Sequence, residues 1–136
     1  MIKILEDLWI MKDSLVVFKK VSNEKINDQL FGGFMSAIES ISRTLDKSGI
    51  SNLQIGDKKF YFIKRENFMF IGNSIKIVKE KDILQELNLI ANKFFSLYPI
   101  EKFENWNGDI SLLTDFENYI KETLDPSFGK LKSSIW

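Results

Sequence analysis

The chain has 136 residues, 44% of them hydrophobic, and this length and apolar content predict one globular domain with its own core. Nineteen basic residues balance nineteen acidic ones, so the excess of positive charge that nucleic-acid binding uses is missing. Cysteine and histidine are both absent, which removes the thiol nucleophile, the commonest general base and the commonest metal ligands. We therefore predict a soluble, cytoplasmic protein that is not an enzyme and that holds no cofactor and no metal.

A hairpin is predicted at the start of the chain. Residues 5–12 and 15–22 are β-rich runs, and Asp13-Ser14 between them is a two-residue connection of the kind that closes a hairpin. No stretch here or later approaches the roughly 20 apolar residues that a membrane-spanning helix needs.

A long helix is predicted over residues 27–49, with Asn27 or Asp28 as its N-cap and Gly49 just past its C-terminus. Two adjacent glycines, Gly32 and Gly33, lie near its start, and each should cost roughly 1 kcal/mol relative to alanine. Apolar residues recur at three-and-four spacing along one face. That face is expected to pack on the sheet, and it consists of Leu30, Phe34, Ala37, Ile38, Ile41 and Leu45.

Three short β-type runs follow and predict a meander, because turn residues separate them. The runs are residues 50–55, 58–65 and 68–74, and the turns are Gly56-Asp57 and Glu66-Asn67. In the middle run Phe60 and Phe62 lie on one face while Tyr61 and Ile63 lie on the other. The sheet is therefore covered on both sides, or it keeps one face for a partner.

Two further helices and a tail complete the predicted order β-β-α-β-β-β-α-α. The second helix covers residues 81–99, with Asp82 as N-cap and Pro99 as terminator. Its expected inward face consists of Ile83, Leu87, Ile90, Ala91, Phe94 and Tyr98. The third covers residues 109–125, and the tail, 126–136, has four apolar side chains. We expect the tail to dock on the domain or on a partner, a weak membrane contact being the lesser option.

This order of elements resembles the longin domain of the wider longin and roadblock superfamily. The stretches "LWIMK", "LFGGFMSAI" and "FMFIGNS" are similar to small stand-alone archaeal longin-like proteins. The resemblance covers residues 1–125 as one domain. It implies an α+β fold whose five-stranded antiparallel sheet carries the first helix on one face and the last two on the other. Proteins of this kind serve in vesicle trafficking and bind or regulate small GTPases, usually as dimers and without catalysis of their own.

A candidate partner-binding surface lies on the first helix. With Leu30 to Leu45 turned inward, one edge of the helix carries a stripe of small residues, which are Gly33, Ser36, Ser40 and Thr44. Phe31 and Met35 occupy the opposite edge, and Gly32 points outward. The stripe would let a partner's backbone approach closely, with the two large side chains as anchors. In the competing interpretation Gly33 only admits a close approach of helix to sheet, and Phe31 and Met35 overhang the core.

The strand around Leu53 is short and polar, and at a sheet edge it could add a strand from another chain. A solvated edge is an equal alternative.

These features together predict a non-catalytic protein-interaction module, a dimerising longin-type platform that binds or regulates a small GTPase or a trafficking-like complex. It would form a homo- or heterodimer through the first helix and third strand, without nucleic acid and with at most peripheral membrane contact. Two alternatives remain. A small-molecule or lipid-sensing domain would have an apolar pocket under the second helix near Phe94 and Phe95. A structural subunit of a larger assembly would fold poorly alone.

Overall fold

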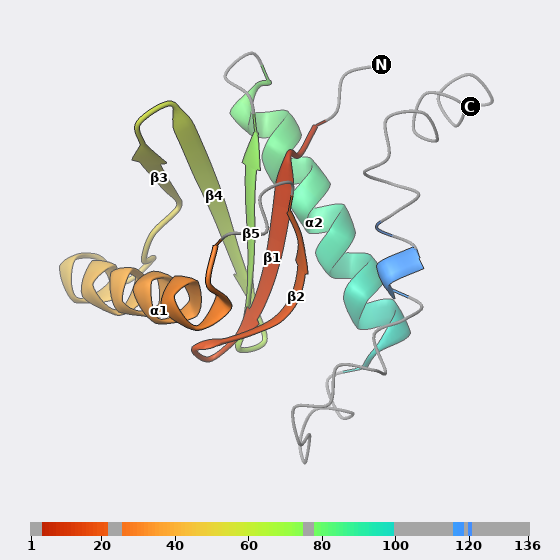
Figure 1. The fold of residues 1–136 in the computed structure, drawn as a ribbon, viewed down its shortest axis with the longest axis horizontal. Helices are drawn as coiled ribbons and strands as arrows, with labels where there is room; N and C mark the ends of the chain where they lie inside the picture. The colour runs from red at the N-terminus through yellow and green to blue at the C-terminus, as the bar shows by residue number, and fades with distance from the viewer. Residues whose placement is uncertain (1–3, 22–25, 75–77, 100–115, 119, 121–136) are drawn as a thin grey trace.

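A computed structural model describes residues 4–21, 26–74, 78–99, 116–118 and 120. It contains a five-stranded antiparallel sheet with a long helix on each face (Figure 1), which confirms the predicted α+β fold. The strand order is β2-β1-β5-β4-β3. The elements are β1 (Asp7–Lys12), β2 (Leu15–Lys20), α1 (Asp28–Leu45), β3 (Asn52–Ile55), β4 (Lys58–Arg65), β5 (Phe68–Ser74) and α2 (Glu80–Leu97).

The sheet has two cores because its strands carry large apolar side chains in both directions. On the α2 side, Tyr61 of β4 packs with Phe68 and Phe70 of β5. On the α1 side, Phe60 and Phe62 of β4 pack with their own set of residues. The alternation predicted for β4 is thus confirmed, and both faces of the sheet are covered.

The core under α2 is formed by the face that the sequence predicts. All six residues of that face are buried, namely Ile83, Leu87, Ile90, Ala91, Phe94 and Tyr98. Gly72 of β5 lies beneath them, and a Cβ there would come within 2.8 Å of Leu5 and 3.1 Å of Leu87. The missing side chain therefore permits the close packing of α2 on the middle of the sheet.

The predicted third helix falls mostly outside the described residues. Residues 116–118 and 120 are helical, and Phe116 and Ile120 are buried in the core on the α2 side. The backbone N–H of Phe116 donates to the hydroxyl of Tyr98 at 3.1 Å. The tail, 126–136, lies outside the described residues altogether.

The ends of the helices follow the sequence in part. Asn27 is the N-cap of α1, and its side chain accepts a hydrogen bond from the N–H of Leu30 at 2.9 Å. The prediction for α2 was wrong by one turn, because Lys79 is its N-cap and Asp82 lies inside the first turn. Gly49 does have a positive φ of 74°, but it follows the end of α1 by several residues, since Asp46 is the C-cap.

Candidate functional site

The inward face of α1 differs from the predicted one. Phe31 and Met35 point into the sheet and are buried, and the ring of Phe31 stacks on Trp9 of β1 with centroids 4.4 Å apart. They are core residues in this chain, so the prediction that they occupy an exposed edge of the helix was wrong. Of the two interpretations of Phe31 and Met35, the structure supports the one that assigns them to the core.

The face that was expected to be buried is instead the exposed one. Four of its large apolar side chains are solvent-accessible: Leu30 at 74%, Phe34 at 41%, Ile41 at 63% and Leu45 at 83%. Ala37 is exposed between them and Ile38 is half-buried. A continuous row of apolar side chains along one helix is more than a monomer usually exposes to water. We call the four residues Leu30, Phe34, Ile41 and Leu45 the outer row, and this row is the main candidate for a binding surface.

The sequence suggested that Gly33 admits the close approach of a partner or of the sheet and that Gly32 faces outward, whereas the structure shows the reverse. Gly32 is buried, and a Cβ at this position would overlap the carbonyl oxygen of Ser14 in the β1–β2 turn. Gly33 is exposed, and a Cβ there would have nothing within 4 Å. The prediction that Gly32 faces outward was therefore wrong. Gly32 lets α1 lie directly against the hairpin, whereas Gly33 has no contact that requires a glycine.

The remaining predicted partner residues lie beside the outer row. Ser40 is exposed and Ser36 half-buried, and the hydroxyl of Ser36 accepts a hydrogen bond from that of Ser14 at 3.0 Å. Leu53 of β3 is half-buried against the core under α1. The structure brings α1 and β3 to the same side of the molecule (Figure 1), while it places Phe31, Gly32 and Met35 beneath the helix.

Strand β3 is one of the two edges of the sheet, as its short polar sequence suggested. It pairs with β4 alone, from Asn52 opposite Tyr61 to Ile55 opposite Lys58. Ile55 is 51% exposed at the end of this strand. The open edge of β3 and the outer row of α1 are thus two surfaces that no described residue of the chain covers.

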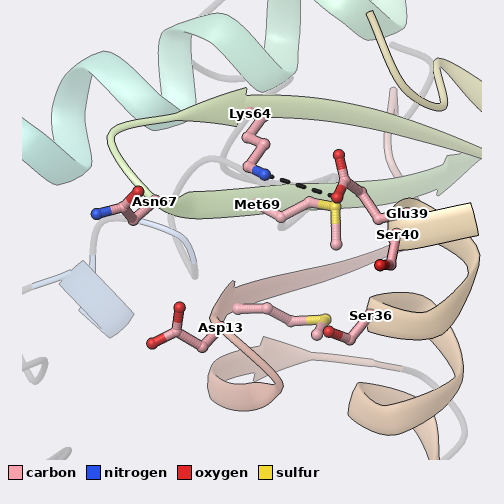
Figure 2. Close-up of a pocket in the computed structure, with 8 residues that line it drawn as sticks. Asp13, Ser36, Glu39, Ser40, Lys64, Asn67 and Met69 are labelled. Atoms are coloured by element: carbon pink, nitrogen blue, oxygen red, sulfur yellow. Dashed lines mark ion pairs between the residues drawn. The ribbon is translucent and has the colours of Figure 1, made fainter. Parts of the chain in front are cut away.

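A second feature is a groove of about 230 Å³ between α1 and the turns of the β1–β2 and β4–β5 hairpins. Figure 2 shows Ser36, Glu39 and Ser40 on its α1 side. Met11 of β1 and Met69 of β5, which are both buried, form its floor. The small serine side chains leave this space open, so part of the predicted small-residue stripe borders a groove within one chain.

The charged residues that line the groove all take part in ion pairs, including Asp13, whose Oδ2 lies 3.6 Å from Lys12 Nζ. Glu39 accepts from Arg43 Nε at 2.5 Å, and Lys64 Nζ lies 3.6 Å from its other oxygen (Figure 2). Asp13 and Asn67 stand at the opposite rim, on the turns of the β1–β2 and β4–β5 hairpins. Sequence reasoning missed this groove, because its lining comes from residues near positions 13, 39 and 67 that only the fold brings together.

The space under α2, where a ligand-sensing domain would have its pocket, is filled with aromatic rings. Phe94 lies 5.3 Å from Phe68, 5.7 Å from Phe70 and 5.2 Å from Phe116, measured between ring centroids. Phe95 packs on the same two strand residues. Phe94 is fully buried by these contacts, so its side chain is part of the core.

Among the described residues, no three acidic side chains gather closely enough to hold a metal ion. None of the helices in the described part of the chain is both long and apolar enough to cross a membrane.

The chain matches no protein-family model. No curated protein matches its sequence either. Among solved structures, it is similar to Myxococcus xanthus MglB, with a TM-score of 0.49 and 10% sequence identity, over 68% of this chain and 77% of that chain.

Proposed function

We propose that this protein is a non-catalytic interaction module that pairs with a second copy of itself through the outer row of α1 and the edge of β3. The observation that carries the proposal is the outer row, Leu30, Phe34, Ile41 and Leu45, exposed along a helix whose other face already fills the core. Burying such a row removes apolar surface from water, which is the main driving force of association.

A second copy is a suitable partner because the exposed face of α1 is self-complementary. The large residues of the outer row stand beside the small residues Gly33, Ala37 and Ser40. If two α1 helices cross antiparallel near Ala37 on a twofold axis, Phe34 of each lies opposite Ile41 of the other. The large side chains of the two rows then bury one another, with Ala37 of each helix close to the crossing point. The open edge of β3 offers unpaired backbone groups to the same kind of partner.

The proposal is tested by measuring mass in solution by light scattering. We expect the wild type to show twice the monomer mass of 15.9 kDa, and Phe34→Glu or Ile41→Glu to show the monomer mass. Each glutamate would bury an unpaired charge in the interface but would stay solvated in the monomer. Leu89→Glu, at a half-exposed position on α2 and hence on the other side of the sheet, is the matched control and should stay dimeric.

A monomeric wild type would refute self-association. A dimer that survives Phe34→Glu and Ile41→Glu would place the interface elsewhere.

The finer form of the proposal is that the pair serves as a platform for a small GTPase or a trafficking-like complex. Its support is the resemblance of "LWIMK", "LFGGFMSAI" and "FMFIGNS" to longin-like proteins. Capture from native extract, with wild type and Phe34→Glu compared in parallel, should recover a GTPase whose retention depends on the bound nucleotide. Recovery of partners that show no nucleotide dependence would count against a GTPase platform and leave the pairing proposal intact.

A further inference from the structure

The sheet has two edge strands, β2 and β3, and they differ in how well they could accept a further strand. The order β2-β1-β5-β4-β3 leaves each of them with a neighbour on one side only. An edge strand presents unpaired backbone N–H and C=O groups, so it can add a strand from another molecule. A chain with two such edges can add copies without limit, whereas a chain that pairs through one edge stops at two. The state of the second edge therefore decides how many copies assemble.

Strand β3 has the features of an open edge. All four of its residues pair in regular register with β4, from Asn52 opposite Tyr61 to Ile55 opposite Lys58. Residues 52–55 include no lysine and no proline, two residue types that commonly protect an edge from strand addition. Nothing within β3 itself hinders a further strand.

Strand β2 is irregular in its middle. Ile10 of β1 lies opposite Phe18 of β2. The next residue of β1, Met11, lies opposite Val16, so Val17 is an extra residue in β2. Val17 and Phe18 both pack in the core on the α2 side, as the two residues of a β-bulge do. A bulge bends and twists its strand, and it interrupts the row of backbone groups that an added strand would need.

Two adjacent lysines occupy the end of β2 beyond the bulge. Lys19 and Lys20 follow each other in the strand, so their side chains lie on opposite faces of the sheet. Lys19 is held at the start of α1 by an ion pair with Asp28, with 2.8 Å between Nζ and Oδ1, and Lys20 is exposed. A second β2 strand placed antiparallel alongside would bring two such lysine pairs together. Like charges on neighbouring strands destabilise a sheet.

We propose that the bulge and the two lysines close the β2 edge to strand addition, so that association ends at a pair of copies and does not continue into an open-ended sheet. Leu15, 54% exposed at the start of β2, would otherwise favour such growth. The limit of two copies rests on the proposed pairing through α1 and β3. The closure of β2 concerns the opposite edge of the sheet and can be tested by itself.

The test opens the β2 edge by substitution and measures mass in solution by sedimentation. Lys19→Thr together with Lys20→Thr removes both charges and introduces residues that suit a strand. In the Phe34→Glu background, which keeps the α1 face from pairing, we expect this double substitution to change the mass from one copy to two. In the wild-type background we expect particles larger than two copies.

Deletion of Val17, added to the two lysine substitutions, should strengthen this association. The alternation of side chains along β2 survives the deletion, because Val16 packs on the α1 side and Phe18 on the α2 side. The deletion thus restores a regular edge, with the loss of one buried side chain. Circular dichroism checks that this variant is folded, and if it is not, the lysine substitutions alone decide.

Lys58→Thr together with Lys59→Thr is the matched control. It removes two adjacent lysines from β4, which has a strand on each side and hence no free edge. The control should keep the mass of its parent in both backgrounds.

The inference is overturned if Lys19→Thr with Lys20→Thr leaves the Phe34→Glu chain monomeric, or if the control gains mass as well. It is also overturned if the wild type assembles beyond two copies. A monomeric wild type would refute only the pairing proposal, and the lysine substitutions in β2 should then give the otherwise wild-type chain a mass of two copies.

Discussion

The most informative single residue is Gly32, whose missing side chain sets how α1 sits on the sheet. Its neighbour Gly33 occupies the same helix with open space around it, so the two form a natural comparison. Alanine favours a helix over glycine by about 1 kcal/mol at either position. At position 32 the added methyl would meet the backbone of Ser14, which has no rotamer with which to move away. The same substitution therefore has opposite effects one residue apart.

We expect Gly33→Ala to raise the free energy of unfolding by about 1 kcal/mol. Gly32→Ala should lower it by roughly 1 to 2 kcal/mol, because overpacking outweighs the gain in helix propensity. Denaturant unfolding of both variants in the Phe34→Glu background checks this without interference from pairing. Equal stabilisation by the two substitutions would contradict the orientation of α1.

Asp46, the C-cap of α1, gives a prediction about pH. The side chain of Ser48 donates to Asp46 Oδ1 at 2.7 Å and its backbone N–H donates at 2.9 Å, and these two bonds hold the pKa of Asp46 below its ordinary value. Since the folded pKa is the lower one, the contribution to stability is present above the unfolded value of 3.8 and is lost as pH falls through the folded pKa.

Titration of the Asp46 carboxyl by NMR should show this lowered pKa. Ser48→Ala should raise it part of the way, because the bond from the hydroxyl is lost and the backbone bond remains. An unchanged pKa in Ser48→Ala would mean that the hydroxyl does not hold the carboxylate in solution.

At the scale of elements, the two edge strands differ in what they are proposed to do. Ile55 on β3 and Leu15 on β2 are exposed to nearly the same extent, 51% and 54%, at opposite edges of the sheet. A lysine on an edge strand opposes addition of another strand. We expect Ile55→Lys to lower the dimer fraction measured by sedimentation, and Leu15→Lys to leave it unchanged, with little effect of either on folding. If both variants or neither dissociate the pair, β3 has no special part in it.

The strands could be predicted from the sequence because their signals are local. The boundaries of β4 and β5 agree with the predicted ones, 58–65 and 68–74, because turn residues separate short β-rich runs. At the second turn Glu66 and Asn67 both have positive φ, the backbone that such tight connections require. The inward face of α2 could be predicted for a similar reason, since most of its apolar residues recur along one side and Leu89 is the exposed exception.

The orientation of α1 could not be predicted, because this helix is apolar on two neighbouring sides. Counting apolar residues favours the larger set, from Leu30 to Leu45, whereas the structure buries the smaller one with Phe31 and Met35. Which face of α1 is buried depends on contacts with residues distant in sequence, namely the ring of Trp9 and the backbone carbonyl of Ser14. The sequence suggested that Gly32 faces outward, toward a partner, whereas the contact that requires a glycine is with the Ser14 carbonyl of the same chain.

For the whole molecule, the sheet divides the protein into two sides with different tasks. On the α2 side, aromatic rings fill the interior around Phe94, and Phe116 and Ile120 add to the same core. On the α1 side, a smaller core suffices to hold a helix that still exposes a row of large apolar side chains. The larger core thus lies on the α2 face of the sheet, and the surface that we propose for recognition lies on the α1 face (Figure 1).

Because Gly32 packs against the Ser14 carbonyl, the residues of α1 that hold the fold are different from those that we propose to choose the partner. Positions 31, 32 and 35 hold α1 to the sheet, while Leu30, Phe34, Ile41 and Leu45 touch little of their own chain. The residues of the outer row can therefore be substituted, in evolution or in the laboratory, without disturbing the core. Two copies of this domain with complementary changes there would prefer each other over themselves, while each kept the same interior.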